Sequence, residues 1–407
     1  MTEVVERFLR YVAIDTQSED DREEFPSTDK QKDLAKLLRD ELTELGATVD
    51  YDEKYGYVYA KIPASAGCED KPTLGLIAHM DTSSEASGAN VKARIIENFD
   101  GNDIVLNEDL GIVMSMAKFP HIAKYKGQSL IVTDGTTLLG ADDKAGVAEI
   151  MTVASKLLRG ECEPHGPISI AFTPDEETGR GVDFFDIGRF GADFAYTVDG
   201  GQLGELEFEN FNAAGGIVKI KGVSIHPGDA KGKMVNASLV ASEFMEILPK
   251  DERPDTTEGY EGFYHLDSVE GCVEEATLKY IIRDHNRAKF NARKALFASR
   301  ADSLNEKYGK GTVEVIVKDQ YFNMREIIEP DYMFLIDKAS DAMRACGVEP
   351  IIKPIRGGTD GARLSFLGLP CPNICTGGMN YHGRFECCCV ESMQTTVEIL
   401  SALISGV

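Results

Sequence analysis

The sequence predicts an α/β protein in which one layered domain is interrupted by a smaller α+β domain. Short apolar segments of buried-strand type alternate with helical segments over the first two hundred residues and again after about residue 325. This alternation is typical of a layered domain with a largely parallel sheet. From about residue 212 the order changes to strand–helix–strand–helix–strand, which suits a small insert. We therefore expect a main domain from residues 1–211 and 325–407, and an inserted domain from residues 212–324.

The elements of the main domain follow from periodicity and stop signals. Apolar residues recur at helical spacing over 4–12 and over 31–45, where Gly46 is a stop signal. Strands are expected where short apolar runs follow, and a helix is expected over 144–158. The expected strands are 56–62, 73–81, 168–174 and 194–201. After the insert we expect a helix near 331–345, strands at 350–355 and 371–375, and a last helix at 391–404.

The insert shows the same signals in a different order. Strands are expected at 213–225, 276–283 and 312–319, with helices at 236–248 and from about 286 to 308. No internal repeat or long flexible linker separates these segments. We therefore expect the insert to be a compact domain of its own.

Composition excludes several classes of function. Lys and Arg total 43 against 68 Asp and Glu, so the formal net charge is −25, which disfavours nucleic acid and anionic lipid as partners. No apolar run reaches the roughly 18 residues of a membrane helix, and the first residues lack a secretion signal. The nine cysteines are odd in number and irregular in spacing, which indicates a reducing, cytoplasmic location. Cys371 and Cys375 could be half of a structural zinc site, but no second pair at finger spacing supports it.

Acidic residues and histidines follow the predicted strands of the main domain. They occur in five separate segments, namely His79-Met80-Asp81, Asp142-Asp143, Glu176-Glu177, Asp199 and His382. In open α/β sheets the carboxyl ends of the strands line the ligand crevice. Taken singly, each Asp could be a cap or turn residue, and the glutamate pair could be a solvated loop. Their convergence on one edge instead indicates a metal site.

The residue types narrow the kind of metal site. Two histidines with several carboxylates suit Zn²⁺, Mn²⁺ or Co²⁺. Because too many carboxylates converge for one ion, two ions about 3.5–4 Å apart with a bridging carboxylate are the more economical arrangement. One of the adjacent glutamates can then bind an ion while its neighbour stays free as a base.

Several sequence strings resemble a known family. The segments H-M-D (79–81), G-A-D-D-K-A-G (140–146), T-P-D-E-E-T-G (173–179), V-D-G-G (198–201) and Y-H-G (381–383) resemble the co-catalytic zinc exopeptidases. Three longer strings resemble the peptidase T family within that clan, namely E-L-E-F-E-N-F-N-A-A (205–214), S-I-H-P-G-D-A-K-G-K-M-V-N-A (224–237) and R-G-G-T-D-G-A (356–362). The resemblance implies a three-layer α/β/α catalytic domain with an inserted lid and dimerisation domain.

The resemblance also implies a role for each strand-end residue. His79 and Asp199 would hold one Zn²⁺ and Glu177 and His382 the other, with Asp142 bridging the two ions and joined to Asp143 by a cis peptide. Glu176 would be the general base. Asp81 would bond the far nitrogen of His79 and so fix its tautomer.

Three residues of the implied substrate site need separate consideration. His226 matches a lid histidine that would reach the partner subunit's active site, although a histidine before Pro227 could equally be a turn residue. Arg283 would bind the terminal carboxylate of the substrate, to which the geometry of arginine is suited. Otherwise it would be a salt-bridged structural residue. Arg356 begins a glycine turn before a helix and could help present backbone N–H groups to an anion, or could only form the turn.

The implied function is that of a cytoplasmic, dimeric, dizinc aminopeptidase that releases the N-terminal residue of tripeptides. The nearest alternative is a dipeptidase or an N-acyl amino acid amidohydrolase of the same clan. A catalytically silent metal-binding protein is the rival of another class, and the intact Glu176 argues against it. The sequence does not specify the metal used in the cell, the preferred N-terminal residue or the redox sensitivity of Cys387–Cys389.

Overall fold

The computed structural model describes all 407 residues, which separate into two compact units. The first unit contains residues 1–208, 326–353 and 359–407, and the second contains residues 209–325 and 354–358. The first has an α/β core and the second an α+β core. The predicted fold class is therefore confirmed.

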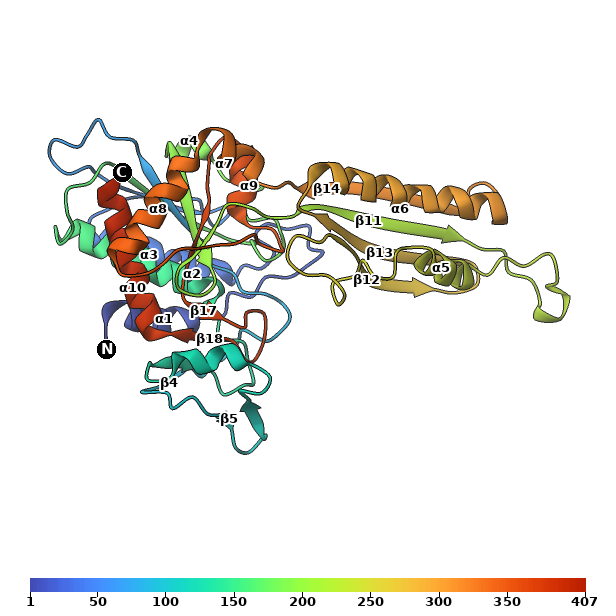
Figure 1. Ribbon diagram of the computed structural model, residues 1–407, viewed down its shortest axis with the longest axis horizontal. Helices are drawn as coiled ribbons and strands as arrows, with labels where there is room; N and C mark the ends of the chain where they lie inside the picture. The colour runs from blue at the N-terminus through green and yellow to red at the C-terminus, as the bar shows by residue number, and fades with distance from the viewer. The chain divides into compact units, whose positions relative to one another are not determined.

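An eight-stranded mixed sheet forms the middle layer of the first unit (Figure 1). Its strand order is β1-β2-β8-β3-β9-β16-β10-β15. The central strands β8, β3, β9 and β16 run parallel, so their carboxyl ends meet at one edge of the sheet. The strands are β1 (Thr48–Tyr51), β2 (Val58–Ile62), β3 (Leu74–His79), β8 (Ile168–Thr173), β9 (Phe194–Gly200), β10 (Glu205–Glu207), β15 (Ile351–Ile352) and β16 (Asn373–Cys375).

Helices cover both faces of this sheet. On one face α3 packs against β3 and β9 and is itself covered by α1 and α10, while α4 and α9 lie on the other. Because both faces are covered, β3 and β8 are buried along their whole length, as their continuous apolar sequences require. The helices are α1 (Glu3–Val12), α2 (Gln31–Leu45), α3 (Ala141–Leu158), α4 (Ile187–Phe190), α7 (Arg325–Asp331), α8 (Met333–Ala345), α9 (Asp360–Phe366) and α10 (Val390–Gly406).

A second, smaller sheet of the first unit has the strand order β17-β18-β7-β4. A hairpin of β5 and β6 and the 3-10 helix η1 pack with it around an apolar cluster that includes Leu130 and Phe99. The adjacent cysteines Cys387–Cys389 form β18 and are buried, and all nine cysteines are free thiols. The bounds are β4 (Arg94–Ile96), β5 (Ile104–Asn107), β6 (Ile112–Met114), η1 (Pro120–Tyr125), β7 (Leu130–Val132), β17 (Gly378–Met379) and β18 (Cys387–Cys389).

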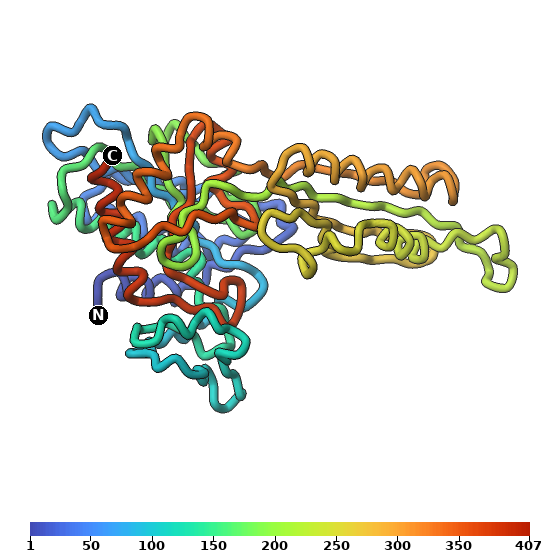
Figure 2. The backbone as a smooth tube through the Cα atoms, viewed as in Figure 1, coloured from blue at the N-terminus to red at the C-terminus, as the bar shows by residue number.

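The second unit is an antiparallel sheet with two helices on one face. Its strand order is β12-β13-β11-β14, and α5 and α6 bury the apolar side chains of the sheet around Phe244 and Phe297. Figure 2 shows the long strands of this unit running side by side. The elements are β11 (Asn212–Lys221), η2 (Pro227–Asp229), α5 (Ala237–Glu246), β12 (Phe263–Gly271), β13 (Glu275–Asp284), α6 (Arg287–Tyr308) and β14 (Val313–Tyr321).

Buried asparagines tie together one end of this second unit. The Asn210 side chain accepts the N–H of Met324 at 2.7 Å, and that of Asn212 accepts the N–H of Asn323 at 3.1 Å. Asn212 and Asn323 both donate to the carbonyl oxygen of His285. The asparagines of the E-N-F-N segment therefore join the segment that enters the unit to the segment that leaves it.

Several elements differ from their predicted extents. The pattern missed β12, which is buried only at Phe263 and Tyr264 and half-buried or exposed afterwards, and it missed the small sheet, whose strands are two or three residues long. It also missed β1 and β10, whereas the helix expected after the Arg356 turn is present as α9. The helix expected near 331–345 is present as α8, and a separate short helix that was not expected, α7, precedes it from Arg325. None of the helices is long and apolar enough to cross a membrane.

Candidate metal centre

Three predicted ligands meet at the carboxyl edge of the large sheet. His79 ends β3, Asp199 lies near the end of β9, and Asp142 is in the first turn of α3. The Nε2 atom of His79 lies 2.8 Å from Oδ1 of Asp142 and 3.5 Å from Oδ1 of Asp199. These distances place an imidazole nitrogen and two carboxylates around one point.

Two further ligands lie on the other side of Asp142. The Nε2 atom of His382 is 3.2 Å from Oδ2 of Asp142 and 3.0 Å from Oε2 of Glu177. Asp142 thus faces one histidine with each of its oxygens, as a bridging carboxylate does. The peptide bond between Asp142 and Asp143 is cis, as the resemblance implied.

Asp143 also lies within reach of this centre. Its oxygens, however, accept the backbone N–H groups of His79 at 3.2 Å and Gly146 at 3.1 Å. With its oxygens occupied in this way, Asp143 holds the backbone of one ligand in place. This leaves Asp142 as the carboxylate that faces both histidines.

The electrostatics of the cluster are those of a cation site. Burial raises the pKa of Asp199 to about 6 and that of Glu177 to about 8. Burial alone would also raise the pKa of Asp142, but hydrogen bonds from His382 and His79 lower it. Hydrogen bonds to Asp142 and Glu177 raise the pKa of His382 to about 12. The buried carboxylates therefore need positive charge beside them, which metal ions can supply.

The donor set fits two borderline metal ions. The nearest ligand atoms of His79, Asp142 and Glu177 lie within 4.8 Å of one another. The Oε1 atom of Glu177 is buried without a hydrogen-bond partner. This is expected of a carboxylate oxygen that binds a cation, because the cation takes the place of a hydrogen-bond donor. Imidazole nitrogens with carboxylate oxygens suit Zn²⁺, Mn²⁺ or Co²⁺.

Asp81 contacts residues on both sides of the centre, although it is not one of the proposed metal ligands. Its Oδ1 accepts the N–H of Glu176 at 3.0 Å and lies 3.3 Å from Nδ1 of His79, which is also 3.1 Å from the backbone carbonyl oxygen of Asp81. Its Oδ2 accepts the N–H of Glu177 at 3.2 Å. One fully buried carboxylate therefore orients a histidine and fixes the backbone of both glutamates.

Glu176 differs from its neighbour Glu177 in its surroundings. Its carboxyl group makes no hydrogen bond, and burial together with the negative charges of Asp199 and Asp360 raises its pKa well above the usual range. A carboxyl group with a raised pKa beside a metal site can accept and return a proton near neutral pH.

Sequence reasoning missed several supporting residues. Asp175 accepts hydrogen bonds from Ser27 and Gln31 and anchors the turn before Glu176. Asp360 is buried and accepts a hydrogen bond from Thr173 at 2.8 Å. Asp175 lies in the string T-P-D-E-E-T-G and Asp360 in R-G-G-T-D-G-A. The strings therefore contained both residues, but they did not show which acidic residues support the backbone and which face the centre.

The remaining predicted residues belong to the second unit. The side chain of His226 is 80% exposed and its Nδ1 accepts the N–H of Gly228. Arg283 donates to the carbonyl oxygen of Arg356 at 3.1 Å, while its Nε is buried without a partner. The guanidinium of Arg356 donates to Thr257, Gly259 and Glu261, so it holds their loop. Arg283 thus has donor capacity left for a ligand.

Known proteins resemble this chain in sequence and in fold. Residues 208–312 match the family model described as a peptidase dimerisation domain. Peptidase T of Desulfitobacterium hafniense strain Y51 is 56% identical over 404 residues, which cover 99% of this chain and 98% of that protein. The aminopeptidase PepT of Bacillus cereus has the same fold, with a TM-score of 0.74 at 24% identity over 99% of this chain and 98% of the other. A tripeptidase of Staphylococcus aureus gives 0.75 at 22% identity over 99% and 97%.

The fold and the donor set define a metallopeptidase with an inserted dimerisation domain. A sequence identity of 56% over 99% of the chain shows that the chain belongs to the peptidase T family. The predicted family and enzyme class, an aminopeptidase of the peptidase T type, are therefore confirmed.

Proposed function

We propose that the chain is a cytoplasmic, homodimeric, dizinc enzyme that releases the N-terminal residue of tripeptides. The observation that carries this proposal is the position of Asp142, whose two oxygens face His79 and His382 separately. The ions would be held by His79, Asp142, Glu177, Asp199 and His382. When bound, they would supply a Lewis acid for the scissile carbonyl and lower the pKa of water.

The chain's own residues would move the proton. Glu176 accepts a proton from the attacking water and returns it to the leaving amine. Asp81 keeps the Glu176 backbone in place through the 3.0 Å hydrogen bond, so the base stays beside the ligands. It also fixes the His79 tautomer that leaves Nε2 free for an ion.

Selection of tripeptides would depend on both ends of the substrate. Arg283 would bind the terminal carboxylate through the donors that it does not use within its own unit. The carbonyl oxygen of Arg356 holds the Arg283 guanidinium, so Arg356 would contribute by placing it. The buried acids of the metal centre would attract the free N-terminal ammonium.

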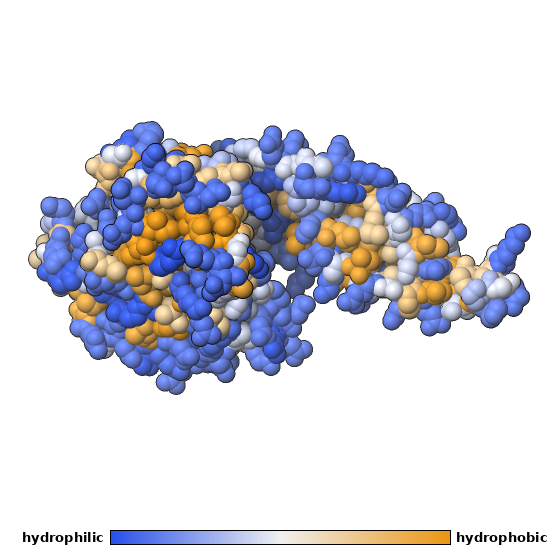
Figure 3. Space-filling view, turned by 90° about the horizontal axis from the view of Figure 1, so that it is seen from below, coloured by the Kyte–Doolittle hydropathy of each residue, from blue (hydrophilic) through white to orange (hydrophobic).

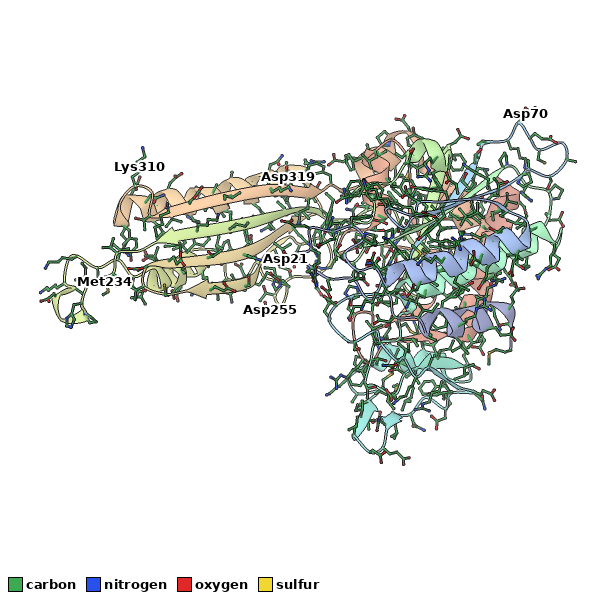
Figure 4. The ribbon with its side chains drawn as sticks, turned by 180° about the vertical axis from the view of Figure 1, so that it is seen from behind. Asp21, Asp70, Met234, Asp255, Lys310 and Asp319 are labelled. Atoms are coloured by element: carbon green, nitrogen blue, oxygen red, sulfur yellow. The ribbon has the colours of Figure 1, made fainter.

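The position of His226 supports a dimer. β11 and β13 pair along ten residues, with Asn212 opposite Asp284 at one end and Lys221 opposite Glu275 at the other. His226 follows Lys221, whereas Arg283 precedes Asp284, so the two lie at opposite ends of strands about 30 Å long. Figure 4 likewise shows Met234, in the loop of His226, at one end of this unit and Asp255 toward the other. An extended tripeptide spans only about 10 Å. If both side chains act on one substrate, they must come from different subunits.

The surface of the second unit is compatible with such an association. Leu239 of α5 is 68% exposed, and Val269 and Val223 are about half exposed. Figure 3 shows apolar side chains among polar ones on this unit. These side chains are available for contact with a second chain, and the matched family model describes a dimerisation domain.

Peptide kinetics on protein reconstituted with Zn²⁺ test the proposal. We expect hydrolysis of tripeptides with free ends and little hydrolysis of dipeptides, tetrapeptides or N-acylated amino acids. Amidation of the tripeptide C-terminus should lower kcat/KM about ten- to a hundredfold, since a charge-assisted bond is lost. Arg283→Ala should cause a similar loss on the free acid and little further loss on the amide. A preference for dipeptides or acylated substrates would contradict the proposal.

A further inference from the structure

Glu386 is a buried carboxylate beside the metal centre, and it is not one of the proposed metal ligands. It lies between His382 and β18 and is 1% exposed. Its Oε2 accepts the N–H groups of Leu139 at 2.7 Å and Gly140 at 2.8 Å, and its Oε1 accepts the N–H of Asp142 at 3.0 Å. All three donors belong to the turn that carries the bridging carboxylate.

That turn cannot satisfy these donors by itself. Gly140 has a φ of 81°, and Asp142 has φ −88° and ψ 102°, so the backbone is not helical there although α3 has begun. The N–H groups of Leu139, Gly140 and Asp142 lie before or within the first turn of α3, where a helix provides no carbonyl partner. A buried unsatisfied donor is costly, and a carboxylate can accept several at once.

Glu386 also belongs to the loop of the second histidine ligand. Its N–H donates to Gly383 at 3.1 Å, and the Asn380 side chain donates to Phe385 at 3.1 Å, so the segment containing His382 closes on itself. Glu386 therefore connects two loops that are 240 residues apart in the chain, one carrying Asp142 and the other carrying His382.

We propose that Glu386 is a positioning residue that sets the distance between the bridging carboxylate of Asp142 and the imidazole of His382. The inference rests on the proposed two-metal centre and adds a residue to it. Without Glu386 the Asp142 turn loses its shared acceptor, and the position between His382, Glu177 and Asp142 is no longer preformed. The ion held there is then bound more weakly, because both Asp142 and the His382 loop lose their support. The position at His79 and Asp199 loses only the support of Asp142 and is weakened less.

The test is metal titration of metal-free protein, with Glu386→Gln as the variant. The side chain keeps its size, but the NH₂ group of the amide replaces one carboxylate oxygen. That group cannot accept a hydrogen bond, so at least one backbone N–H of the turn loses its acceptor. We expect wild-type protein to bind two equivalents of Zn²⁺ or Co²⁺. The variant should bind the second equivalent about 10–100-fold more weakly than wild type, as changes of supporting residues typically cause, and the first equivalent should be weakened clearly less. The visible absorption of the Co²⁺ form should change more for the second equivalent than for the first.

Glu391→Gln is the matched control. Both oxygens of Glu391 accept the N–H of Ser129, at 3.1 and 2.8 Å, so this glutamate also supports a backbone turn but contacts no proposed ligand. It should leave both equivalents unchanged. If Glu386→Gln is poorly folded, Glu386→Asp, which keeps the charge but shortens the reach, should show a smaller weakening of the second equivalent.

The outcomes separate the two proposals. Two equivalents bound by Glu386→Gln with wild-type affinity would overturn the role of Glu386 and leave the metal centre intact. Fewer than two equivalents bound by wild-type protein would instead contradict the two-metal centre. Equal weakening of both equivalents would show that Glu386 supports the fold generally.

Discussion

At the residue scale, the adjacent glutamates Glu176 and Glu177 have different surroundings, which suit the opposite roles proposed for them. Glu177 faces His382 at 3.0 Å, while Glu176 makes no side-chain hydrogen bond. Asp81 accepts the backbone N–H groups of both glutamates, so the difference between them depends on where each side chain points. A ligand and a base can thus stand side by side because one buried carboxylate fixes the turn.

Glu176→Gln should therefore abolish turnover and keep the metal ions. The amide cannot take a proton from water, and loss of a general base typically costs about 10²–10⁴ in rate. Peptide kinetics and metal analysis of the same preparation check this, with two ions per chain expected. A variant with near wild-type kcat would show that another group is the base.

Asp142→Ala should lower metal content more than Asp199→Ala or His382→Ala. Asp142 faces both histidines, whereas in the proposed centre Asp199 and His382 would each hold one ion only. Equilibrium dialysis followed by metal analysis measures the difference. Equal losses in all three variants would argue against a bridging role.

At the scale of elements, the close packing of α3 on the large sheet brings Asp142 to the strand ends. A Cβ added at Gly146 would lie 1.8 Å from the carbonyl oxygen of Val198, so helix and strand approach too closely for any side chain there. The same helix buries Glu149, whose two carboxyl oxygens have no hydrogen-bond partner. Helix α3 is therefore the element whose placement the site depends on most.

Gly146→Ala should destabilise the protein and weaken the metal centre. The added methyl group must push α3 away from β9, and overpacking of this kind costs about 1–3 kcal/mol or more. Thermal unfolding of the metal-free form should show a clearly lowered Tm. Gly406→Ala, where a Cβ meets nothing within 4 Å, is the control and should leave the Tm unchanged.

Glu149 should make stability depend on pH. Burial raises its pKa well above the usual range. Because the folded pKa exceeds the unfolded one, its stabilising contribution is complete below the unfolded pKa of about 4.3 and is lost as pH rises through the folded pKa. Glu149→Gln mimics the neutral form, so its Tm relative to wild type should rise with pH. The exposed Glu44→Gln should show no such trend; a flat difference for Glu149→Gln would show that the carboxyl has a partner or stays neutral throughout.

At the scale of the whole molecule, the long antiparallel pairing of β11 and β13 separates His226 from Arg283. If both residues serve one substrate, the active site is complete only in an assembly of two chains. The inserted unit would then contribute to catalysis as well as to association.

Mixing two inactive variants tests this arrangement. His226→Ala and Glu176→Gln should each be inactive as homodimers, and activity should return when the subunits exchange. In the mixed dimer one site has an intact Glu176 and receives an intact His226 from the other chain. The measurement is peptide hydrolysis after exchange proven by differential tagging. Absence of recovery would place His226 in its own chain's site or outside catalysis.

The sequence by itself determined the fold class, the family and the convergence of acids and histidines on the carboxyl edge of the sheet. These follow from local patterns, because alternating strands and helices and the strings around His79, Asp142 and Glu176 lie within short stretches of chain. Helices α1, α2 and α10 were predicted within one or two residues for the same reason. The small sheet escaped prediction because strands of two or three residues carry too little periodicity.

Only the tertiary structure decided which carboxylates support the centre and which face it. Asp143, Asp175 and Glu386 are the same residue types as the proposed ligands, but their oxygens accept backbone N–H groups. Whether a carboxylate meets a backbone donor or a histidine depends on loops brought together from distant parts of the chain. The physical reason is that a buried carboxylate must be compensated, and its partners are set by packing that no local pattern contains.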